Sequence, residues 1–402
     1  MANKRRVSLV FRALVEIAII AVAVVIGLQV AAGFREPVVD EASSGDVALD
    51  REAAPLDQLG LREQDERSWE PDTQSPPQRV VVVDLWPGRT ARLSEAAPGV
   101  EVVVVADASA ARAEVGDADA LLGALDPALL AAGERLRWVQ LASAGVERYL
   151  AIPGLAESDL ILTNAQRIFA PGGAEHVMAL VLALARRLPR SLELQTAREW
   201  NAEAVTGPSP YVGEGSELIE LRGRTMLVAG LGGIGTETAR LAAGMGMRVT
   251  ATRNSSREGP SFVDYVGLSH ELLELAREAD VIVNALPLTA STARVFDAEM
   301  FDAMKPGAFF VNIGRGGTVD TEALTAVLAS GRLGGAGLDV TDPEPLPPEH
   351  PLWALPNVII TPHIGGDSDG HMERMYLLFE ENLRRFAKGE PLLSVVDRAR
   401  GY

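Results

Sequence analysis

The sequence predicts an α/β fold with two doubly wound, parallel-sheet domains, preceded by one membrane-spanning helix. Short apolar runs alternate with helical patterns from residue 79 onward, as in chains that form parallel sheets. A glycine-rich turn joins one of these runs directly to a helical pattern, at residues 225–244. Residues 13–32 are almost entirely apolar and, as a helix, are long enough to span a hydrocarbon layer of about 30 Å.

The glycine-rich turn lies between two predicted strands. Residues 225–229 form a short apolar run typical of a buried parallel strand, and residues 248–252 form the next strand. In a dinucleotide-binding unit, Gly230 permits the tight turn, Gly232 lets backbone approach a pyrophosphate, and Gly235 allows close helix–strand packing. The full turn consists of Gly230, Leu231, Gly232, Gly233, Ile234 and Gly235. We therefore expect phosphates at the start of the following helix; a structural turn without a ligand is the alternative.

Length, charge and cysteine content exclude several classes of protein. At 402 residues the chain is long enough for about two to three domains. It has no cysteine, which excludes disulfides and cysteine metal ligands, and we predict no metal site. The formal charge of −18 argues against a nucleic-acid partner. Half of this charge is local, because residues 36–77 carry a net charge of −9.

The N-terminal region predicts membrane association. Basic residues at 4–6 and 12 precede the apolar stretch 13–32, an arrangement that suits an uncleaved anchor or a cleaved signal peptide. We assign residues 1–35 to this segment. A buried helix of a soluble domain is the weaker alternative. Residues 36–78 are acidic and rich in Pro and Ser, so we expect a disordered tether.

The remaining chain predicts two sets of strands and helices. Expected strands of the first set are 79–84, 100–105, 121–122, 138–141 and 160–163. The second set adds strands at 281–284, 308–312, 335–339 and 358–361 and helices at 269–278, 297–304 and 321–330. A nearly all-apolar helix at 174–188 is expected to be buried at a domain or subunit junction. We interpret His176 on this helix as a structural histidine. Residues 200–217 are expected to be an irregular surface connection.

The position opposite the expected adenosine ribose is Arg253, eighteen residues beyond Gly235. An acidic residue there would accept hydrogen bonds from both ribose hydroxyls and repel a phosphate. Arg253, followed by Asn254 and two serines, instead offers cationic and polar donors for a 2′-phosphate. We therefore expect NADP(H) as the preferred cofactor, with NAD(H) possible.

Three ionisable residues directly follow predicted parallel strands: Arg315, Glu344 and His363. This places them at the sheet edge where ligands bind in open α/β folds. A guanidinium can bind the carboxylate and keto oxygen of a 2-oxo acid, and an imidazolium can protonate the alkoxide formed by hydride transfer. A carboxylate beside the imidazole stabilises its protonated form and orients the ring. Taken singly, each residue also has an ordinary structural interpretation.

Residues 143–147 lie just past another predicted strand. Ser143, Ala144 and Gly145 are small, which leaves their backbone amides accessible to a carboxylate. An ordinary tight turn is the alternative interpretation of this loop.

These residues belong to a series of motifs in which the chain resembles the D-isomer-specific 2-hydroxyacid dehydrogenase family over residues 79–402. The motifs are SAGVE at 143–147, AEH at 174–176, GLGGIG at 230–235, LPLT at 286–289, NIGRGG at 312–317, LDVTDPEPLP at 338–347, HPLW at 350–353, TPHIGG at 361–366 and ENLRRFAKGEPLLSVVD at 381–397. Their order and spacing are far more specific than the glycine turn alone.

The resemblance implies a role for each motif. It implies that Arg315 binds substrate, that Glu344 pairs with His363, and that His363 is the acid/base. Substrate carboxylate would bind the amides of residues 143–145. The cofactor would contact Asp339 and the backbone of the LPLT motif, which consists of Leu286, Pro287, Leu288 and Thr289. Two departures stand out: Arg253 replaces the family's common acidic residue, and residues 1–78 have no counterpart in the family's domains.

The resemblance also implies a domain organisation. A flavodoxin-like substrate domain would comprise residues 79–164 and, after the chain returns, residues 364–402. A Rossmann NAD(P)-binding domain would comprise residues 165–363. Members of the family are usually dimers formed through the nucleotide-binding domains, so we expect a homodimer.

The leading hypothesis is an NAD(P)-dependent oxidoreductase that transfers hydride between nicotinamide and a small 2-oxo or D-2-hydroxy acid, such as glyoxylate or hydroxypyruvate. One alternative is a membrane-tethered, dinucleotide-sensing or interaction protein on the same scaffold, and another is an enzyme acting on phosphite or formate. The side of the membrane stays open. The positive residues favour a cytoplasmic N-terminus with the enzyme on the far side, whereas a soluble nicotinamide cofactor favours the cytoplasm.

Overall fold

The computed structural model describes residues 76–85, 91–155, 157–207 and 217–401. These residues belong to one compact unit, Ala53–Tyr402, so the domain boundaries predicted at residues 164 and 363 stay predictions. The apolar stretch 13–32 and most of the predicted tether lie outside the described residues. Within the part of the chain that is described, no helix has both the length and the apolar character needed to cross a bilayer.

The first sheet has five parallel strands in the order β2-β1-β3-β4-β5. This is the strand order of flavodoxin-like folds. The strands are β1 (Arg79–Val83), β2 (Glu101–Val105), β3 (Ala120–Gly123), β4 (Trp138–Leu141) and β5 (Ile161–Thr163). Between them lie α2 (Ala91–Ala96), α3 (Ala108–Glu114), η2 (Val115–Asp117), α4 (Pro127–Ala132) and α5 (Glu147–Leu150). The predicted flavodoxin-like α/β domain is confirmed.

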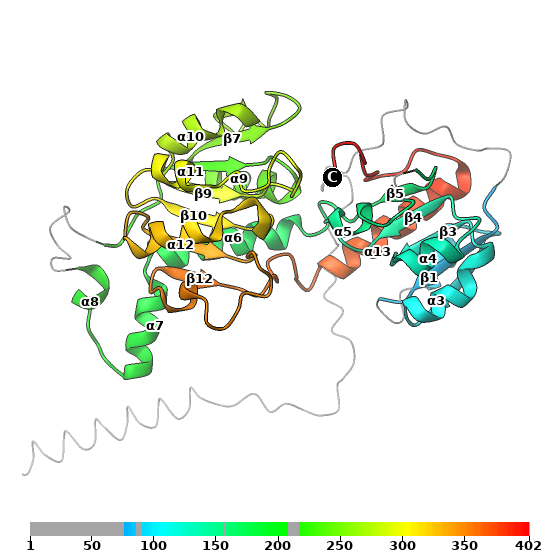
Figure 1. Cartoon of the computed structure of the whole chain (residues 1–402), viewed down its shortest axis with the longest axis horizontal. Helices are drawn as coiled ribbons and strands as arrows, with labels where there is room; N and C mark the ends of the chain where they lie inside the picture. Colours follow the sequence, from blue (N-terminus) through cyan, green and yellow to red (C-terminus); the bar gives the residue numbers. More distant parts are fainter. Residues whose placement is uncertain (1–75, 86–90, 156, 208–216, 402) are drawn as a thin grey trace, which may run out of the picture. The chain divides into compact units, whose positions relative to one another are not determined.

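The second sheet has seven parallel strands in the order β12-β11-β10-β9-β6-β7-β8. Counted from β8, the first six strands have the order 3-2-1-4-5-6 of dinucleotide-binding folds, which confirms the second predicted domain (Figure 1). The strands are β6 (Thr225–Ala229), β7 (Arg248–Arg253), β8 (Tyr265–Leu268), β9 (Val281–Asn284), β10 (Phe309–Asn312), β11 (Gly335–Leu338) and β12 (Val358–Ile360).

Helices of two lengths accompany the second sheet. The longer ones are α6 (Ala170–Ala185), α7 (Leu188–Ala197), α9 (Gly233–Gly244) and α12 (Thr321–Ala329). The shorter ones are α8 (Glu203–Thr206), η3 (Ser269–Glu271), α10 (Leu272–Glu278), α11 (Ala298–Ala303), η4 (Gly316–Thr318) and η5 (Pro351–Ala354). Residues of α6 and α9 share one buried apolar cluster with the sheet. The predicted burial of the helix at 174–188 is therefore confirmed, and its position at a domain or subunit junction stays a prediction.

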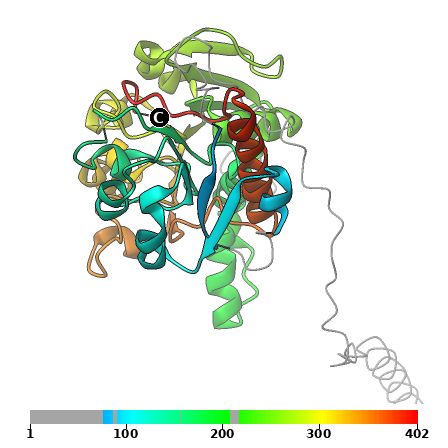
Figure 2. The same cartoon turned by 90° about the vertical axis from the view of Figure 1, so that its right-hand side faces the viewer.

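The last helix, α13 (His371–Lys388), completes the core of the first sheet (Figure 2). Its apolar residues recur at helical spacing and lie in one cluster with residues of β1, β3 and β4. The buried amide of Asn382 joins it to the sheet by donating to Gln140 Oε1 (2.8 Å) and accepting from Leu393 N (2.8 Å). Residues far apart in the sequence therefore form a single hydrophobic core.

The structure corrects three details of the sequence prediction. Helix α6 begins at Ala170 and ends at Ala185 rather than running over 174–188, because Pro171 fits the first helical turn. The helical conformation is interrupted at Arg187, which has a φ of 51°, before α7 begins. Strand β8 was not predicted, since the short sequence YVGL shows no clear alternation. Part of the expected irregular connection forms the short helix α8.

Candidate active site

Arg315, Glu344 and His363 follow three neighbouring strands of the second sheet. Arg315 comes after β10, Glu344 after β11 and His363 after β12, and these strands are paired side by side in parallel. Because parallel strands end at the same edge of a sheet, the three loops emerge together. The structure thus brings the three predicted residues to one edge.

Close backbone contacts hold these loops against one another. A Cβ added at Gly316 would lie 1.8 Å from Thr341 O, and one added at Gly314 would lie 2.6 Å from Leu286 O. No side chain fits at either position, so the loop carrying Arg315 packs directly on the loop leading to Glu344 and on the LPLT loop. The glycines of the NIGRGG motif therefore determine how closely the loops of the site approach.

His363 and Glu344 form a hydrogen-bonded pair. The imidazole Nδ1 lies 2.6 Å from Glu344 Oε1, and both side chains are about half exposed. A carboxylate at Nδ1 favours a proton on that nitrogen and directs Nε2 away from the pair. The arrangement gives a proton-transfer group a fixed orientation while leaving its second nitrogen for a ligand.

A buried carboxylate holds the turn that carries His363. Asp339 Oδ1 accepts from the hydroxyl of Thr361 (2.6 Å) and from Ile364 N (3.1 Å), and Oδ2 accepts from Gly365 N (2.9 Å). The backbone amide of His363 donates to Asp339 O (2.8 Å), and His363 has a φ of 55°. Asp339 thereby stabilises a left-handed conformation that a non-glycine residue seldom adopts.

His176 joins the same cluster, because its Nε2 lies 2.9 Å from the Thr361 hydroxyl oxygen. This agrees with its interpretation as a structural histidine. The sequence analysis places Asp339 at the cofactor, which stays a prediction; in the structure both of its carboxylate oxygens accept hydrogen bonds from the turn. The sequence analysis did not identify Thr361 as a site residue; the indication in the sequence was a hydroxyl-bearing residue two positions before His363.

A second buried network holds the backbone of Arg315. Asn284 Nδ2 donates to Asn312 Oδ1 (2.9 Å) and to Thr318 Oγ1 (2.6 Å). Asn312 Nδ2 (3.2 Å) and the Thr318 hydroxyl (2.7 Å) both donate to the carbonyl oxygen of Arg315. The three polar side chains are almost fully buried, so each hydrogen bond is costly to break. The network fixes the main chain from which the guanidinium extends.

The Arg315 side chain contacts the loop predicted to bind a carboxylate. Its Nε donates to Glu147 Oε1 (3.0 Å), and its Nη1 donates to Gly314 O (2.7 Å). Ser143 Oγ donates to Gly145 O (2.9 Å), and Asn164 Nδ2 donates to Ala144 O (2.8 Å). Both loop carbonyls are thus held by side chains. Sequence reasoning included Glu147 in a motif and did not predict this ion pair.

The glycine turn has the shape that a dinucleotide requires. Gly230 has a φ of 97°, and a Cβ added at Gly235 would lie 2.0 Å from Gly230 O, so neither position accepts a larger residue. A Cβ added at Gly232 would meet nothing within 4 Å, so the space above it is open. Gly232 also caps α9 without any side-chain hydrogen bond. The first amides of α9 can therefore bind phosphate oxygens.

The other predicted cofactor residues surround this turn. Gly233 and Ile234 lie in the first turn of α9, where Ile234 packs against Gly173 of α6 rather than facing outward. Leu286 lies in the loop after β9, and its amide donates to Asn284 Oδ1 (3.2 Å). Pro287 and Thr289 are joined through the hydroxyl of Thr292, which donates to Pro287 O (2.6 Å). Because β6 and β9 are adjacent where the strand order reverses, this edge is the expected crevice for a dinucleotide.

Arg253 ends β7, beside the glycine turn. Its guanidinium donates to Leu231 O (3.3 Å) and to Glu258 O (3.0 Å). The contact with Leu231 places the cation directly against the glycine turn, and Asn254 beside it is exposed.

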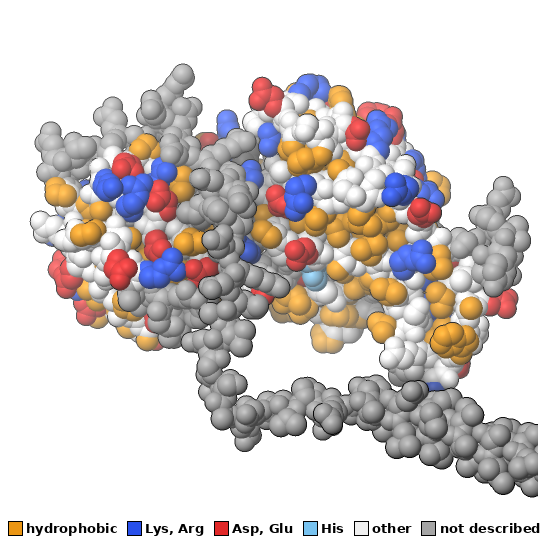
Figure 3. Space-filling model, turned by 180° about the vertical axis from the view of Figure 1, so that it is seen from behind, with side chains coloured by type: hydrophobic (Ala, Val, Ile, Leu, Met, Phe, Trp, Pro, Cys, Tyr) orange, Lys and Arg blue, Asp and Glu red, His pale blue; other side chains and the backbone are white. Residues whose placement is uncertain are grey.

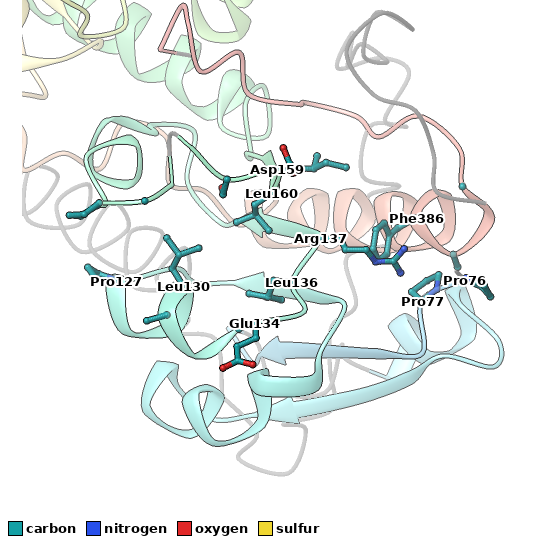
Figure 4. A pocket seen from close by; sticks show the side chains of 18 of the residues that line it. Pro76, Pro77, Pro127, Leu130, Glu134, Leu136, Arg137, Asp159, Leu160 and Phe386 are labelled. Atoms are coloured by element: carbon teal, nitrogen blue, oxygen red, sulfur yellow. The ribbon is translucent and has the colours of Figure 1, made fainter. Parts of the chain in front are cut away.

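A cavity in the described part of the chain lies elsewhere (Figure 4). It has a volume of about 920 Å³ and is lined in part by Leu136, Arg137, Leu160 and Phe386. Leu136 and Arg137 directly precede β4, whereas the loop at 143–147 follows that strand. The cavity therefore lies at the opposite edge of the first sheet and plays no part in the site. In the described ranges, no group of three or more acidic or histidine side chains could hold a metal ion.

Comparisons with known proteins agree with this geometry. The family model "D-isomer specific 2-hydroxyacid dehydrogenase, NAD binding domain" matches residues 178–365. Glyoxylate reductase of Thermococcus onnurineus is 35% identical over 291 residues, which cover 71% of this chain and 84% of the relative. Glyoxylate/hydroxypyruvate reductase B of Escherichia fergusonii is 35% identical over 253 residues, which cover 62% of this chain and 75% of the relative.

A solved structure extends the likeness to the fold. The NADPH-dependent glyoxylate/hydroxypyruvate reductase of Sinorhizobium meliloti, in complex with NADP and sulfate, aligns with a TM-score of 0.68 at 29% identity. The alignment covers 81% of this chain and all of that one. The chain therefore belongs to the D-isomer-specific 2-hydroxyacid dehydrogenase family and is an NAD(P)-dependent oxidoreductase.

Proposed function

We propose that the protein reduces a small 2-oxo acid of the glyoxylate or hydroxypyruvate class to the corresponding 2-hydroxy acid. The observation that carries the proposal is the His363–Glu344 pair on the loop edge that also presents Arg315. Relatives of similar sequence are glyoxylate and glyoxylate/hydroxypyruvate reductases, which supports this substrate class.

Each of the three residues has a distinct role in this reaction. Arg315 binds the substrate carboxylate and polarises the 2-oxo oxygen through paired N–H donors. A nicotinamide cofactor, when bound, would supply the hydride for this reduction. His363 Nε2 donates a proton to the developing alkoxide oxygen, so a 2-oxo acid, a hydride and a proton give a 2-hydroxy acid. Glu344 stabilises the imidazolium before transfer and keeps Nε2 directed at the substrate.

We propose NADPH as the preferred reductant, with NADH accepted less well. The first amides of α9 at Gly232 and Gly233 would hold the pyrophosphate. Arg253 and Asn254 would bind the 2′-phosphate, because the guanidinium lies against the glycine turn and no acidic side chain occupies the end of β7.

The proposal is tested by following NADPH and NADH absorbance with a panel of 2-oxo acids, using the full-length protein and His363→Gln. Reduction of glyoxylate or hydroxypyruvate that is lost in His363→Gln would support it. Binding of NADPH without turnover across the panel would instead favour a dinucleotide-sensing protein. Turnover of formate or phosphite alone would change the substrate class while keeping the fold.

We also propose a homodimer. Leu188, Leu192 and Trp200 are exposed apolar residues in and after α7, and Trp200 is fully exposed in the single chain. Hydrophobic side chains are visible over this part of the molecule in Figure 3. Such a patch is typical of a subunit interface. Light scattering of Leu192→Asp and the unaltered protein would test this, since the variant should lower the measured mass towards one chain.

Membrane association through residues 13–32 is a separate proposal that rests on the sequence alone. Its support is a stretch of twenty residues behind a basic flank that is apolar except for Glu16, Gly27 and Gln29. Recovery of the full-length protein in carbonate-washed membranes would agree with it. Quantitative recovery in the supernatant would contradict it.

A further inference from the structure

Glu147 is the acidic residue in direct contact with the proposed substrate-binding arginine. Its Oε1 accepts a hydrogen bond from Arg315 Nε at 3.0 Å, and both side chains are about 30% exposed. Glu147 is not the carboxylate that pairs with His363; that carboxylate is Glu344, which follows a different strand. The Glu147 carboxylate thus places a negative charge on a cation that we assign to substrate binding.

The contact also involves the loop that would bind the substrate carboxylate. A Cβ added at Gly145 would lie 2.0 Å from Arg315 Nη2 and 2.8 Å from Glu147 Oε2. Any other residue at position 145 would therefore displace the guanidinium or the carboxylate. The glycine lets both charged groups lie directly on the loop backbone, so one oxygen of Glu147 contacts the guanidinium and the other lies against the carboxylate-binding segment.

The guanidinium still has donors for a ligand. Of its five N–H groups, Glu147 and Gly314 each accept one. A substrate with one carboxylate can use the remaining donors and leave the ion pair in place. When one carboxylate of a diacid such as tartronate binds the guanidinium, the second carboxylate, attached to the same carbon, adds a negative charge to a site that already holds the Glu147 carboxylate.

We propose that Glu147 is a specificity-determining residue that selects 2-oxo monocarboxylic acids and excludes 2-oxo dicarboxylic acids. The inference deepens the proposed function and rests on Arg315 as the carboxylate-binding group. The physical cause is Coulomb repulsion: one extra negative charge several ångströms from a partly exposed carboxylate weakens binding by roughly three- to tenfold. Glu147 also orients Arg315, which affects every substrate alike. Only the ratio of the dissociation constants for dicarboxylic and monocarboxylic ligands isolates the effect of the Glu147 charge.

The test compares two ligands that differ by one carboxylate, glycolate and tartronate. Their dissociation constants for the NADPH-loaded, full-length protein are measured by calorimetry, and neither ligand can accept a hydride. In Glu147→Gln, the ratio of the tartronate to the glycolate constant should fall three- to tenfold. Glu147→Asp keeps the charge, so its ratio should stay near that of the unaltered protein even if both ligands bind less tightly.

The control is Glu157→Gln, which removes the same charge from an exposed position in the same part of the chain and should leave the ratio unchanged. An unchanged ratio in Glu147→Gln would overturn the inference, and so would failure of the unaltered protein to bind either ligand. A turnover measurement distinguishes failure of this inference from failure of the proposed function. A protein that reduces glyoxylate with an unchanged ratio contradicts only the role of Glu147. A protein that shows the shifted ratio and reduces no 2-oxo acid contradicts only the proposed reaction.

Discussion

The Thr361 hydroxyl lies 2.6 Å from Asp339 Oδ1 and 2.9 Å from His176 Nε2. Thr361 is two residues from His363, so this hydroxyl joins the buried carboxylate to the segment that carries the proposed acid/base. The positive φ of His363 depends on the same turn. The position of the imidazole is therefore determined by residues that do not contact the substrate in the proposed mechanism.

Thr361→Val tests this positioning role. The variant keeps the side-chain volume and removes the donor to Asp339, which leaves a buried carboxylate oxygen with one hydrogen bond fewer. We expect the free energy of unfolding to fall by about 1–3 kcal/mol and kcat to fall more than NADPH affinity. Thr325→Val is the matched control, because that hydroxyl donates only within α12 (2.7 Å to Thr321 O). Equal effects of the two variants on kcat would contradict the positioning role.

Arg253→Asp tests the cofactor preference. The substitution replaces a cation beside the glycine turn with a carboxylate, which repels a 2′-phosphate and can accept hydrogen bonds from ribose hydroxyls. We expect the KM for NADPH to rise by about 10- to 100-fold while the KM for NADH changes little or falls. Arg240→Asp on the exposed face of α9 controls for the change in net charge. A parallel rise in both KM values would show that Arg253 does not bind the 2′-phosphate of NADPH.

Glu381→Gln tests the electrostatics of α13. Hydrogen bonds from Arg384, and from Arg385 next to it, lower the pKa of Glu381 from 4.5 to about 2. Because the folded pKa is lowered, the stabilisation is fully present above pH 4.5 and is lost as the pH falls towards 2. After allowance for solvent screening of this partly exposed network, we expect the variant to lose about 1 kcal/mol at pH 7.

Urea denaturation between pH 7 and pH 2 measures this effect. The difference in unfolding free energy between Glu381→Gln and the unaltered protein should shrink as the pH falls below 4.5 and vanish near 2. Glu134→Gln, at an exposed loop position, should show no such trend. A difference that stays constant over this range would mean that Glu381 contributes through packing rather than charge.

The sequence predicted most strands because each contains a short apolar run. Strands β4, β6 and β9 coincide with their predicted bounds. The placement of Arg315, Glu344 and His363 at one edge followed from the rule that parallel strands end together. It required no knowledge of side-chain geometry.

The contacts that position these residues could not be predicted in the same way. Glu147 and Arg315 are 168 residues apart, and nothing in either local sequence indicates the pairing. The buried Asn284–Asn312–Thr318 network depends on β9 and β10 being neighbours in register. Asp339 was assigned to the cofactor by resemblance, whereas its hydrogen bonds to the 361–365 turn depend on a backbone conformation that the sequence does not specify.

The central claim is that His363, oriented by Glu344, protonates the substrate as hydride is transferred. The most direct test is kcat for NADPH-dependent glyoxylate reduction by His363→Gln and Glu344→Gln, measured alongside their NADPH dissociation constants. The account predicts that His363→Gln lowers kcat by about 10²- to 10⁴-fold and that Glu344→Gln lowers it to a smaller extent, with NADPH binding unchanged in both. A His363→Gln enzyme that retains kcat within about threefold of the unaltered protein, far less than the loss of a general acid costs, would contradict it.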